Sequence, residues 1–229
     1  MTAGWSVLDT GASAAEFNMA FDEALLHQAV AIGHPVLRFY SWLEPAATFG
    51  YFQPYAMVSN ATELRPLVRR PTGGGIVPHD RDWTYSLIVP VGHDWHGLNA
   101  RRSYEQIHSW IDVALRNLGV ATRLAELAVE GEGKCFVGCE ENDVLFEGNK
   151  IGGAAQRRNR DGLLIQGSIQ PDDSFPDRSE WQAKMIELGE EQFGSSAGPL
   201  STAALTLVQR QVPELVRDKY GDPSYNQKR

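Results

Sequence analysis

The segment Arg69-Arg-Pro-Thr-Gly-Gly-Gly-Ile-Val-Pro-His-Asp80 places two arginines beside three consecutive glycines, residues 73–75. Because glycine has no Cβ, successive backbone N–H groups can turn toward one centre and bind phosphate or carboxylate oxygens. Arg69 and Arg70 could add charge-assisted, bidentate hydrogen bonds to the same anion. The alternative is a glycine turn between two strands with solvated arginines, because glycine patterns alone often mislead.

The bulk composition is that of one large globular domain. The chain has 229 residues, of which 42% are hydrophobic and 22% are charged. No apolar run approaches the roughly 18 residues that span a bilayer, and the first residues lack the order of a signal peptide. Cys135 and Cys139 are too few for a disulfide framework. We therefore expect a cytoplasmic protein that does not associate with membranes.

The charge of the chain limits its partners. The net charge is −8 and the pI is near 5.3, whereas nucleic-acid binding usually needs a basic face. Arginines cluster only locally, at 69–70, 101–102 and 157–160. This distribution suits a small anion better than a nucleic-acid duplex.

Four segments have helical patterns. Capping boxes begin at Ser13 and Ser103, and apolar residues follow each at helical spacing, which predicts helices over about 14–31 and 103–118. Two more helices are expected near 178–193 and 201–220. Pro213 should kink or split the last one.

Strand patterns occupy the middle of the chain, at 36–40, 84–89 and 162–169. Residues 144–151 read as a hairpin with Gly148-Asn149 at its tip. The fold class is therefore α+β, with a central mixed, mostly antiparallel sheet flanked by helices. We expect a single domain over 1–229.

A second constellation is Gly148-Asn-Lys-Ile-Gly-Gly-Ala-Ala-Gln-Arg-Arg158. We expect Lys150 to be exposed at the hairpin tip, and the small residues after it leave room for a ligand against the strand. An ammonium group there could neutralise a phosphate or polarise an acyl carbonyl.

Together the two segments resemble the signature motifs of the lipoate-protein ligase, octanoyltransferase and biotin ligase superfamily. Asn18–Leu26 resembles the first helix of that family, and Arg38–Trp42 with Gly50 and Gln53 resembles its next strand and loop. The resemblance covers about residues 5–170. We recognise no motif in the helical segment 171–229.

The resemblance implies a biotin/lipoate ligase-like catalytic domain with a tunnel for an eight-carbon acyl chain of lipoate or octanoate. It implies that the acyl group passes to a lysine of a lipoyl-carrier domain, such as the 2-oxo acid dehydrogenase acyltransferase subunit or the glycine-cleavage H protein. Lys150 is the expected catalytic residue. The expected substrate-binding residues are Arg69, Arg70, Thr72, Gly73, Gly74, Gly75, His79, Gly153, Ala154 and Gln156.

Two chemistries share this scaffold. A ligase activates lipoate with ATP and Mg²⁺ through lipoyl-AMP, and Asp143 or Asp80 could then help to hold the metal. A transferase takes the acyl group from a thioester, such as that of acyl carrier protein, and needs a thiol but no ATP. Cys135 precedes Lys150 by fifteen residues, as in the cysteine-dependent transferases, and Lys134 could lower the pKa of its thiol.

Other features resemble the ligases. Gly75 stands where the cysteine transferases are expected to have arginine, and Asn142-Asp143 and Lys150-Ile151-Gly152-Gly153 are similar to ligase sequences. A ligase accessory domain is not visible, although some ligases carry it on a separate subunit. We favour the ATP-dependent ligase. One alternative is a transferase with Cys135 as its nucleophile, although Cys135 could also be a small buried thiol without a role. The other alternative is a non-catalytic lipoate-binding protein.

Overall fold

The computed structural model describes residues 4–128 and 138–228. The strands, in chain order, are β1 (Ser6–Ser13), β2 (Val36–Trp42), β3 (Ala46–Phe49), β4 (Leu67–Arg69), β5 (Ile76–His79), β6 (Trp83–Pro90), β7 (Thr122–Leu124), β8 (Val144–Phe146), β9 (Asn149–Arg158), β10 (Gly162–Ile169) and β11 (Gly198–Pro199). The helices are α1 (Ala15–His27), α2 (Ala29–Ile32), α3 (Tyr55–Ala61), α4 (Asp94–Gly97), α5 (Ala100–Asn117), α6 (Arg178–Phe193), α7 (Thr202–Leu215), the π-helical turn η1 (Val216–Tyr220) and α8 (Pro223–Asn226).

The described strands form a large and a small sheet. The large sheet has the order β11-β1-β2-β6-β10-β9-β8-β7, and the small sheet has the order β4-β3-β5. In the large sheet β1 runs parallel to β2 and β11, and every other neighbouring pair is antiparallel. The predicted fold class, a mixed and mostly antiparallel sheet flanked by helices, is confirmed.

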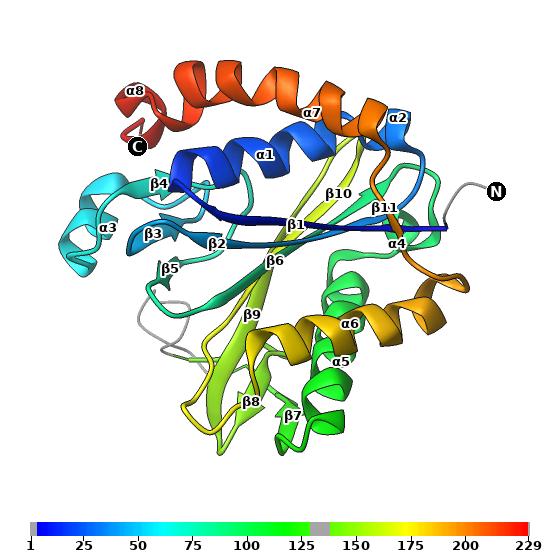
Figure 1. The fold of residues 1–229 in the computed structure, drawn as a ribbon. Helices are drawn as coiled ribbons and strands as arrows, with labels where there is room; N and C mark the ends of the chain where they lie inside the picture. Colours follow the sequence, from blue (N-terminus) through cyan, green and yellow to red (C-terminus); the bar gives the residue numbers. More distant parts are fainter. Residues whose placement is uncertain (1–3, 129–137, 229) are drawn as a thin grey trace.

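Helices cover both faces of the large sheet, with α1 and α7 on one side and α5 and α6 on the other (Figure 1). Side chains alternate along a strand, so neighbouring residues of β2 face opposite cores. Val36 and Tyr40 pack in the core with α1 and α7, whereas Leu37 and Phe39 pack in the core with α5 and α6. This alternation explains why β2 is buried on both faces.

The predicted helices are confirmed, but two of their caps are wrong. The first helix is interrupted at Gln28, and its N-cap is Ala14, with no side-chain hydrogen bond. The second begins at Ala100, and its cap is the Asn99 side chain, which accepts from a backbone N–H. Ser103 lies inside that helix and donates to the Asn99 carbonyl. The helix therefore begins one turn before the predicted capping box, and Asn99 rather than Ser103 is its N-cap.

The C-terminal helices agree with the prediction. α6 begins with a capping box formed by Asp177 and Glu180. α7 continues past Pro213 to Leu215, and a π-helical turn follows it directly. Pro213 therefore does not split this helix.

The predicted strands are confirmed, and the hairpin tip shifts by one residue. Glu147 and Gly148 have positive φ values of 49° and 83°, as a two-residue type I′ turn requires. Lys150 pairs with Leu145 across the hairpin and so belongs to β9. The lysine is a strand residue rather than a tip residue.

A buried ion pair joins α1 to the large sheet. Asp22 and Arg38 are both fully buried, and their side chains approach to 2.7 Å. Ser86 donates to the Asp22 carboxylate from β6, and Gln166 donates to it from β10. Arg38 in turn donates to the side chain of Asn18. One carboxylate therefore connects α1 with three adjacent strands.

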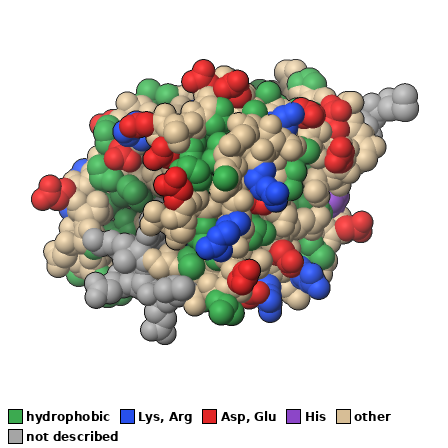
Figure 2. All heavy atoms as spheres, turned by 90° about the horizontal axis from the view of Figure 1, so that it is seen from below, with side chains coloured by type: hydrophobic (Ala, Val, Ile, Leu, Met, Phe, Trp, Pro, Cys, Tyr) green, Lys and Arg blue, Asp and Glu red, His purple; other side chains and the backbone are tan. Residues whose placement is uncertain are grey.

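No helix within the described residues has the length and apolar character needed to cross a bilayer. On the face of the protein shown in Figure 2, Lys and Arg side chains are interspersed with Asp and Glu.

We expect Asp22→Asn to lower the free energy of unfolding by about 3 kcal/mol, because Arg38 would keep a buried and uncompensated charge. Urea denaturation followed by circular dichroism measures this change. Asp173→Asn is the matched control, because Asp173 is 84% exposed and its ion pair with Arg81 lies on the surface. Equal denaturation midpoints for the two variants would show that the buried pair stabilises the fold no more than the surface pair does.

Candidate active site

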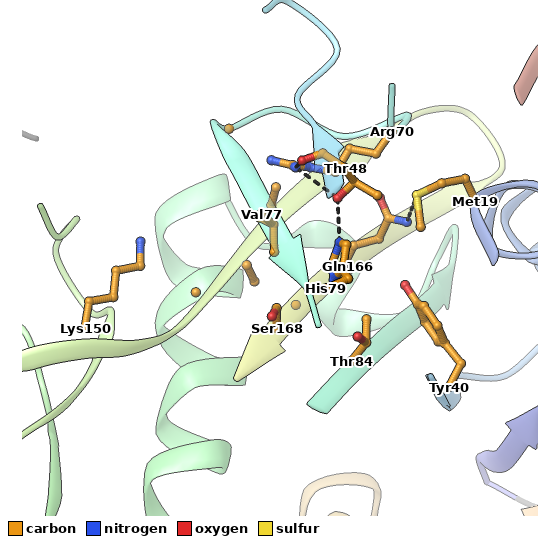
Figure 3. Close-up of a pocket in the computed structure, with 15 residues that line it drawn as sticks. Met19, Tyr40, Thr48, Arg70, Val77, His79, Thr84, Lys150, Gln166 and Ser168 are labelled. Atoms are coloured by element: carbon orange, nitrogen blue, oxygen red, sulfur yellow. Dashed lines mark hydrogen bonds between the residues drawn. The ribbon is translucent and has the colours of Figure 1, made fainter. Parts of the chain in front are cut away.

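A cavity lies between the small sheet and strands β9 and β10 (Figure 3). Lys150 stands at one end of the view, and Tyr40 and Thr84 stand at the other. Val77 and Thr48 line it from the small sheet. The other lining residues are Met19, Arg70, Gly74, His79, Gly153, Ala154, Ala155, Gln166, Gly167 and Ser168.

Lys150 forms a buried ion pair at its end of the cavity. Its Nζ lies 2.6 Å from Oδ2 of Asp143, and the two side chains are 9% and 0% exposed. The prediction of an exposed lysine is therefore wrong. A Cβ on Gly153 would lie 2.8 Å from Cε of Lys150, so Gly153 leaves the space in which the lysine lies along β9. Gly153 thus makes room for the lysine itself, whereas Ala154 and Ala155 line the cavity.

Helix α5 supports the Asp143 carboxylate from behind. Tyr104 donates to Oδ1 of Asp143 at 2.5 Å, and the backbone N–H of Glu140 donates to Oδ2 at 2.7 Å. Burial and the charge of Asp143 raise the pKa of Tyr104 far above its ordinary value, so this hydroxyl keeps its proton. Three donors therefore hold one carboxylate in place beside the cavity.

His108 lies next to this group and is neutral. Burial lowers the pKa of His108 to about 4, and its Nδ1 donates to the carbonyl of Asn142 at 2.7 Å. A neutral imidazole with a fixed tautomer adds no positive charge beside Lys150. Lys150 therefore remains the cation that faces Asp143 from β9.

Asp143 as a metal ligand stays a prediction, and the structure shows its carboxylate engaged by protein groups. Both oxygens of its carboxylate already accept hydrogen bonds or pair with Lys150. Asp80, the other candidate, is exposed and accepts from the backbone of Arg81. Within the described ranges, no group of three or more His, Cys, Asp or Glu side chains is arranged to hold a metal ion.

The glycine loop is packed tightly against Gly50, the residue that follows β3. Gly74 lines the cavity with a φ of 87°, a conformation that side chains with a Cβ rarely adopt. A Cβ on Gly50 would lie 1.9 Å from the Gly74 carbonyl oxygen, so the two backbones touch. Gly73 and Gly75 are not among the described residues that line the cavity.

Arg70 lines the cavity as predicted, but its guanidinium also supports the loop. It donates to the Gly73 carbonyl at 2.5 and 3.0 Å, and to the Thr48 carbonyl at 3.3 Å. Thr72 is buried and donates to Gln166 at 2.8 Å, so it joins the loop to β10. These contacts hold the glycine loop in a fixed conformation. Binding of a substrate by Arg70 and Thr72 stays a prediction.

Arg69 has a different position from the one we predicted. It is fully buried, and it is not among the described residues that line the cavity. Its Nη1 donates to the carbonyls of Tyr51 and Gln53 at 2.8 Å, and its Nη2 donates to the carbonyl of Asn226 at 2.8 Å. In the structure the Arg69 guanidinium binds backbone carbonyls, and its contact with an anion stays a prediction.

His79 lines the cavity within a fixed polar group. Its Nδ1 donates to Asp82 at 2.8 Å, its Nε2 lies 2.8 Å from the Thr48 hydroxyl, and its ring stacks on Trp42. Burial alone would raise the pKa of Asp82. The charge of His79 and the hydrogen bonds that the Asp82 carboxylate accepts outweigh burial, so the pKa of Asp82 lies below its ordinary value. The ring of His79 is thus held in one orientation.

The remaining predicted residues divide into three groups. Gly153 and Ala154 line the cavity. Gln156 does not, because its side chain bonds to Ser103 and to the Ala100 carbonyl at the start of α5. Cys135 and Lys134 lie outside the described residues.

Sequence reasoning missed several cavity residues, namely Met19, Tyr40, Thr48, Thr84, Gln166 and Ser168. Gln166 and Ser168 carried a usable signal, because they are polar residues in a strand that is buried throughout. A polar residue in such a strand needs a partner, and here Gln166 binds Asp22 and Thr72.

Comparison with known proteins gives close relatives. The family model of the lipoyl protein ligase A/B catalytic domain matches residues 14–180. Octanoyltransferase LipM of Staphylococcus aureus is 35% identical over 187 residues, which are 75% of this chain and 67% of that protein. Octanoyltransferase LipM of Bacillus subtilis is 36% identical over 180 residues, 72% of this chain and 64% of that protein. The matches thus span about two thirds of these relatives' length.

A solved structure shares the fold. The structure of a bi-partite lipoate protein ligase from Thermoplasma acidophilum, described together with its E2 lipoyl domain, has a TM-score of 0.69 over 98% of this chain and 96% of that chain, at 21% identity. The family-model match and the identity to the LipM proteins lead to one conclusion: this chain belongs to the lipoyl protein ligase A/B catalytic domain family.

Proposed function

We propose that this protein transfers an octanoyl group from a carrier thioester to a lysine of a lipoyl-carrier domain, with Cys135 as the nucleophile. The observation that carries this proposal is the 35% identity, over 75% of the chain, to proteins named octanoyltransferase. The cavity beside Lys150 supports it. The proposal replaces the ATP-dependent ligase that we favoured from the sequence.

The cavity suggests how the acyl group lies. Lys150 stands at one end, and Met19 and Tyr40 lie toward the other (Figure 3). An acyl group with its carbonyl near Lys150 would extend its carbon chain along Gly153, Ala154 and the other small lining residues. The ammonium group would then face the oxygen on which negative charge develops.

The chemistry takes two acyl transfers. In the first, the Cys135 thiolate attacks the thioester carbonyl carbon, the carbonyl–sulfur bond breaks, and the carrier leaves as a thiol after taking a proton. In the second, the neutral amine of the acceptor lysine attacks the acyl-cysteine, an amide bond forms, and the Cys135 thiolate is released as the amine gives up a proton. Lys150 polarises the carbonyl in both steps. Neither step consumes ATP, and neither step requires Mg²⁺.

The partners follow from this chemistry. We propose acyl carrier protein as the donor, and the glycine-cleavage H protein or the lipoyl domain of a 2-oxo acid dehydrogenase acyltransferase subunit as the acceptor. A cytoplasmic location remains a prediction from the composition. The transfer requires no separate accessory subunit.

The Asp143 carboxylate is the counter-ion of Lys150 and accepts from Tyr104, so we propose that it holds the lysine that faces the acyl carbonyl rather than a metal. The resemblance of Gly75, Asn142-Asp143 and Lys150-Ile151-Gly152-Gly153 to the ligases remains, and the assay below decides between the two chemistries.

Incubation of the protein with a lipoyl domain, followed by mass spectrometry, tests the choice between the two chemistries. We expect the mass of one octanoyl group to be added from octanoyl-carrier thioester without ATP, and no addition from free octanoate or lipoate with ATP and Mg²⁺. Cys135→Ser should abolish the addition. Cys139→Ser, four residues away, is the matched control and should retain it.

The other results have defined meanings. Addition only with ATP, unchanged by Cys135→Ser, would identify a ligase and contradict the proposal. If the protein binds lipoate or the carrier domain but adds no mass from either acyl source, it is a binding protein and the proposal is wrong.

Lys150→Met should lower acyl transfer by about 100-fold, because the ammonium group that faces the carbonyl oxygen is lost. It should also lower the free energy of unfolding by about 3 kcal/mol, because Asp143 would remain buried and charged. The double variant Lys150→Met with Asp143→Asn should recover stability but not activity. Urea denaturation and the transfer assay measure the two effects separately. Near wild-type transfer by either variant would refute the role of Lys150.

A further inference from the structure

We infer that the C-terminal segment 216–228 positions the glycine loop of the acyl site, and that Asn226 and Arg69 are the positioning residues. The inference rests on the proposed function, because it concerns the same cavity. The segment lies outside residues 14–180, which match the family model. It includes η1 and α8, and α8 packs beside β4 (Figure 1).

Arg69 is the joint between the C-terminal segment and the cavity wall. The side-chain oxygen of Asn226 accepts from the backbone N–H of Arg69 at 2.8 Å, and the carbonyl of Asn226 accepts from its guanidinium at 2.8 Å. The same guanidinium donates to the carbonyls of Tyr51 and Gln53, and it stacks over the ring of Phe49. α8 and the turn 50–53 therefore share one buried cation.

The turn 50–53 carries this constraint to the glycine loop. The backbone N–H of Tyr51 donates to the Thr72 carbonyl at 2.8 Å. Gly50 lies directly against the carbonyl of Gly74, with no space for a Cβ between them. A displaced turn would therefore displace Gly74, which forms part of the cavity wall.

The C-terminal segment is itself anchored to the core. Lys219 pairs with the buried carboxylate of Glu23 at 2.6 Å, and the hydroxyl of Tyr220 donates to the same carboxylate at 2.9 Å. Burial raises the pKa of Glu23, but the contacts with Lys219 and Tyr220 outweigh it and lower that pKa, so the anchor is ionic at neutral pH. Asn226 donates to the carbonyl of Tyr220 at 2.8 Å, which joins η1 to α8.

Asn226→Ala tests the inference in the full-length protein. We expect the KM for octanoyl-carrier thioester to rise about fivefold, because the loss of the buried hydrogen bond to Arg69 loosens the cavity wall. The kcat should stay within about twofold, because the reacting groups are unchanged. Hydrogen exchange should speed up in peptides that cover 50–53 and 72–75.

Val208→Ala is the matched control. Val208 is fully buried in the core that contains α1 and α7, so its truncation weakens the fold without touching the contacts of Arg69. We expect no change in its KM and no faster exchange at 72–75. If both variants change the KM and the exchange equally, or if Asn226→Ala changes neither, the positioning role is overturned.

A second variant, and a readout that needs no acyl donor, separate misfolding of the variant from failure of the proposed function. Should Asn226→Ala not fold, Lys219→Gln loosens the anchor at Glu23 instead, and the same two readouts apply. Hydrogen exchange needs no acyl donor. A protein without transferase activity would therefore refute the proposed function, while faster exchange at 72–75 in the variant would still support positioning by the C-terminal segment.

Discussion

The buried pair of Asp22 and Arg38 is the contact on which the rest of the architecture depends. Removing two charges from water costs several kcal/mol per ion, and the pair is tolerable only because every side of it is hydrogen-bonded. Ser86, Gln166 and Tyr40 donate to the carboxylate, and the guanidinium donates to Asn18. The donors come from β2, β6 and β10 and the carboxylate from α1, so the pair forms only when these four elements are correctly assembled.

That network continues from the core to the cavity. Gln166 donates to Asp22 and accepts from Thr72, so one side chain connects the buried ion pair with the glycine loop. On the opposite wall, Tyr104 and Asp143 hold Lys150 along β9. The two motifs of the sequence thus meet across one cavity, and each is supported by polar side chains from outside its own motif. Such support is what a site needs to keep reacting groups in a fixed geometry.

The same principle explains the unexpected position of Arg69. An arginine has five N–H donors, and in the interior each needs an acceptor. The ends of loops and short helices have free carbonyls, so a buried arginine can satisfy several at once. Arg69 does so for the turn 50–53 and for α8. Two adjacent arginines in one motif therefore do different work: Arg70 lines the cavity, whereas Arg69 joins the cavity wall to the C-terminal segment.

The fold class, the main helices and strands, and the two segments that form the cavity follow from the sequence, because hydrophobic periodicity and turn chemistry are local properties. The sequence did not determine where helix α5 begins, that Lys150 is largely shielded from solvent, or that Arg69, Gln156 and Asp143 face protein groups. Several of those outcomes depend on distant partners, such as Tyr104 for Asp143, 39 residues away, and Asn226 for Arg69, 157 residues away. Only the tertiary structure brings these groups together, and a charged or polar side chain takes its role from the partners that surround it.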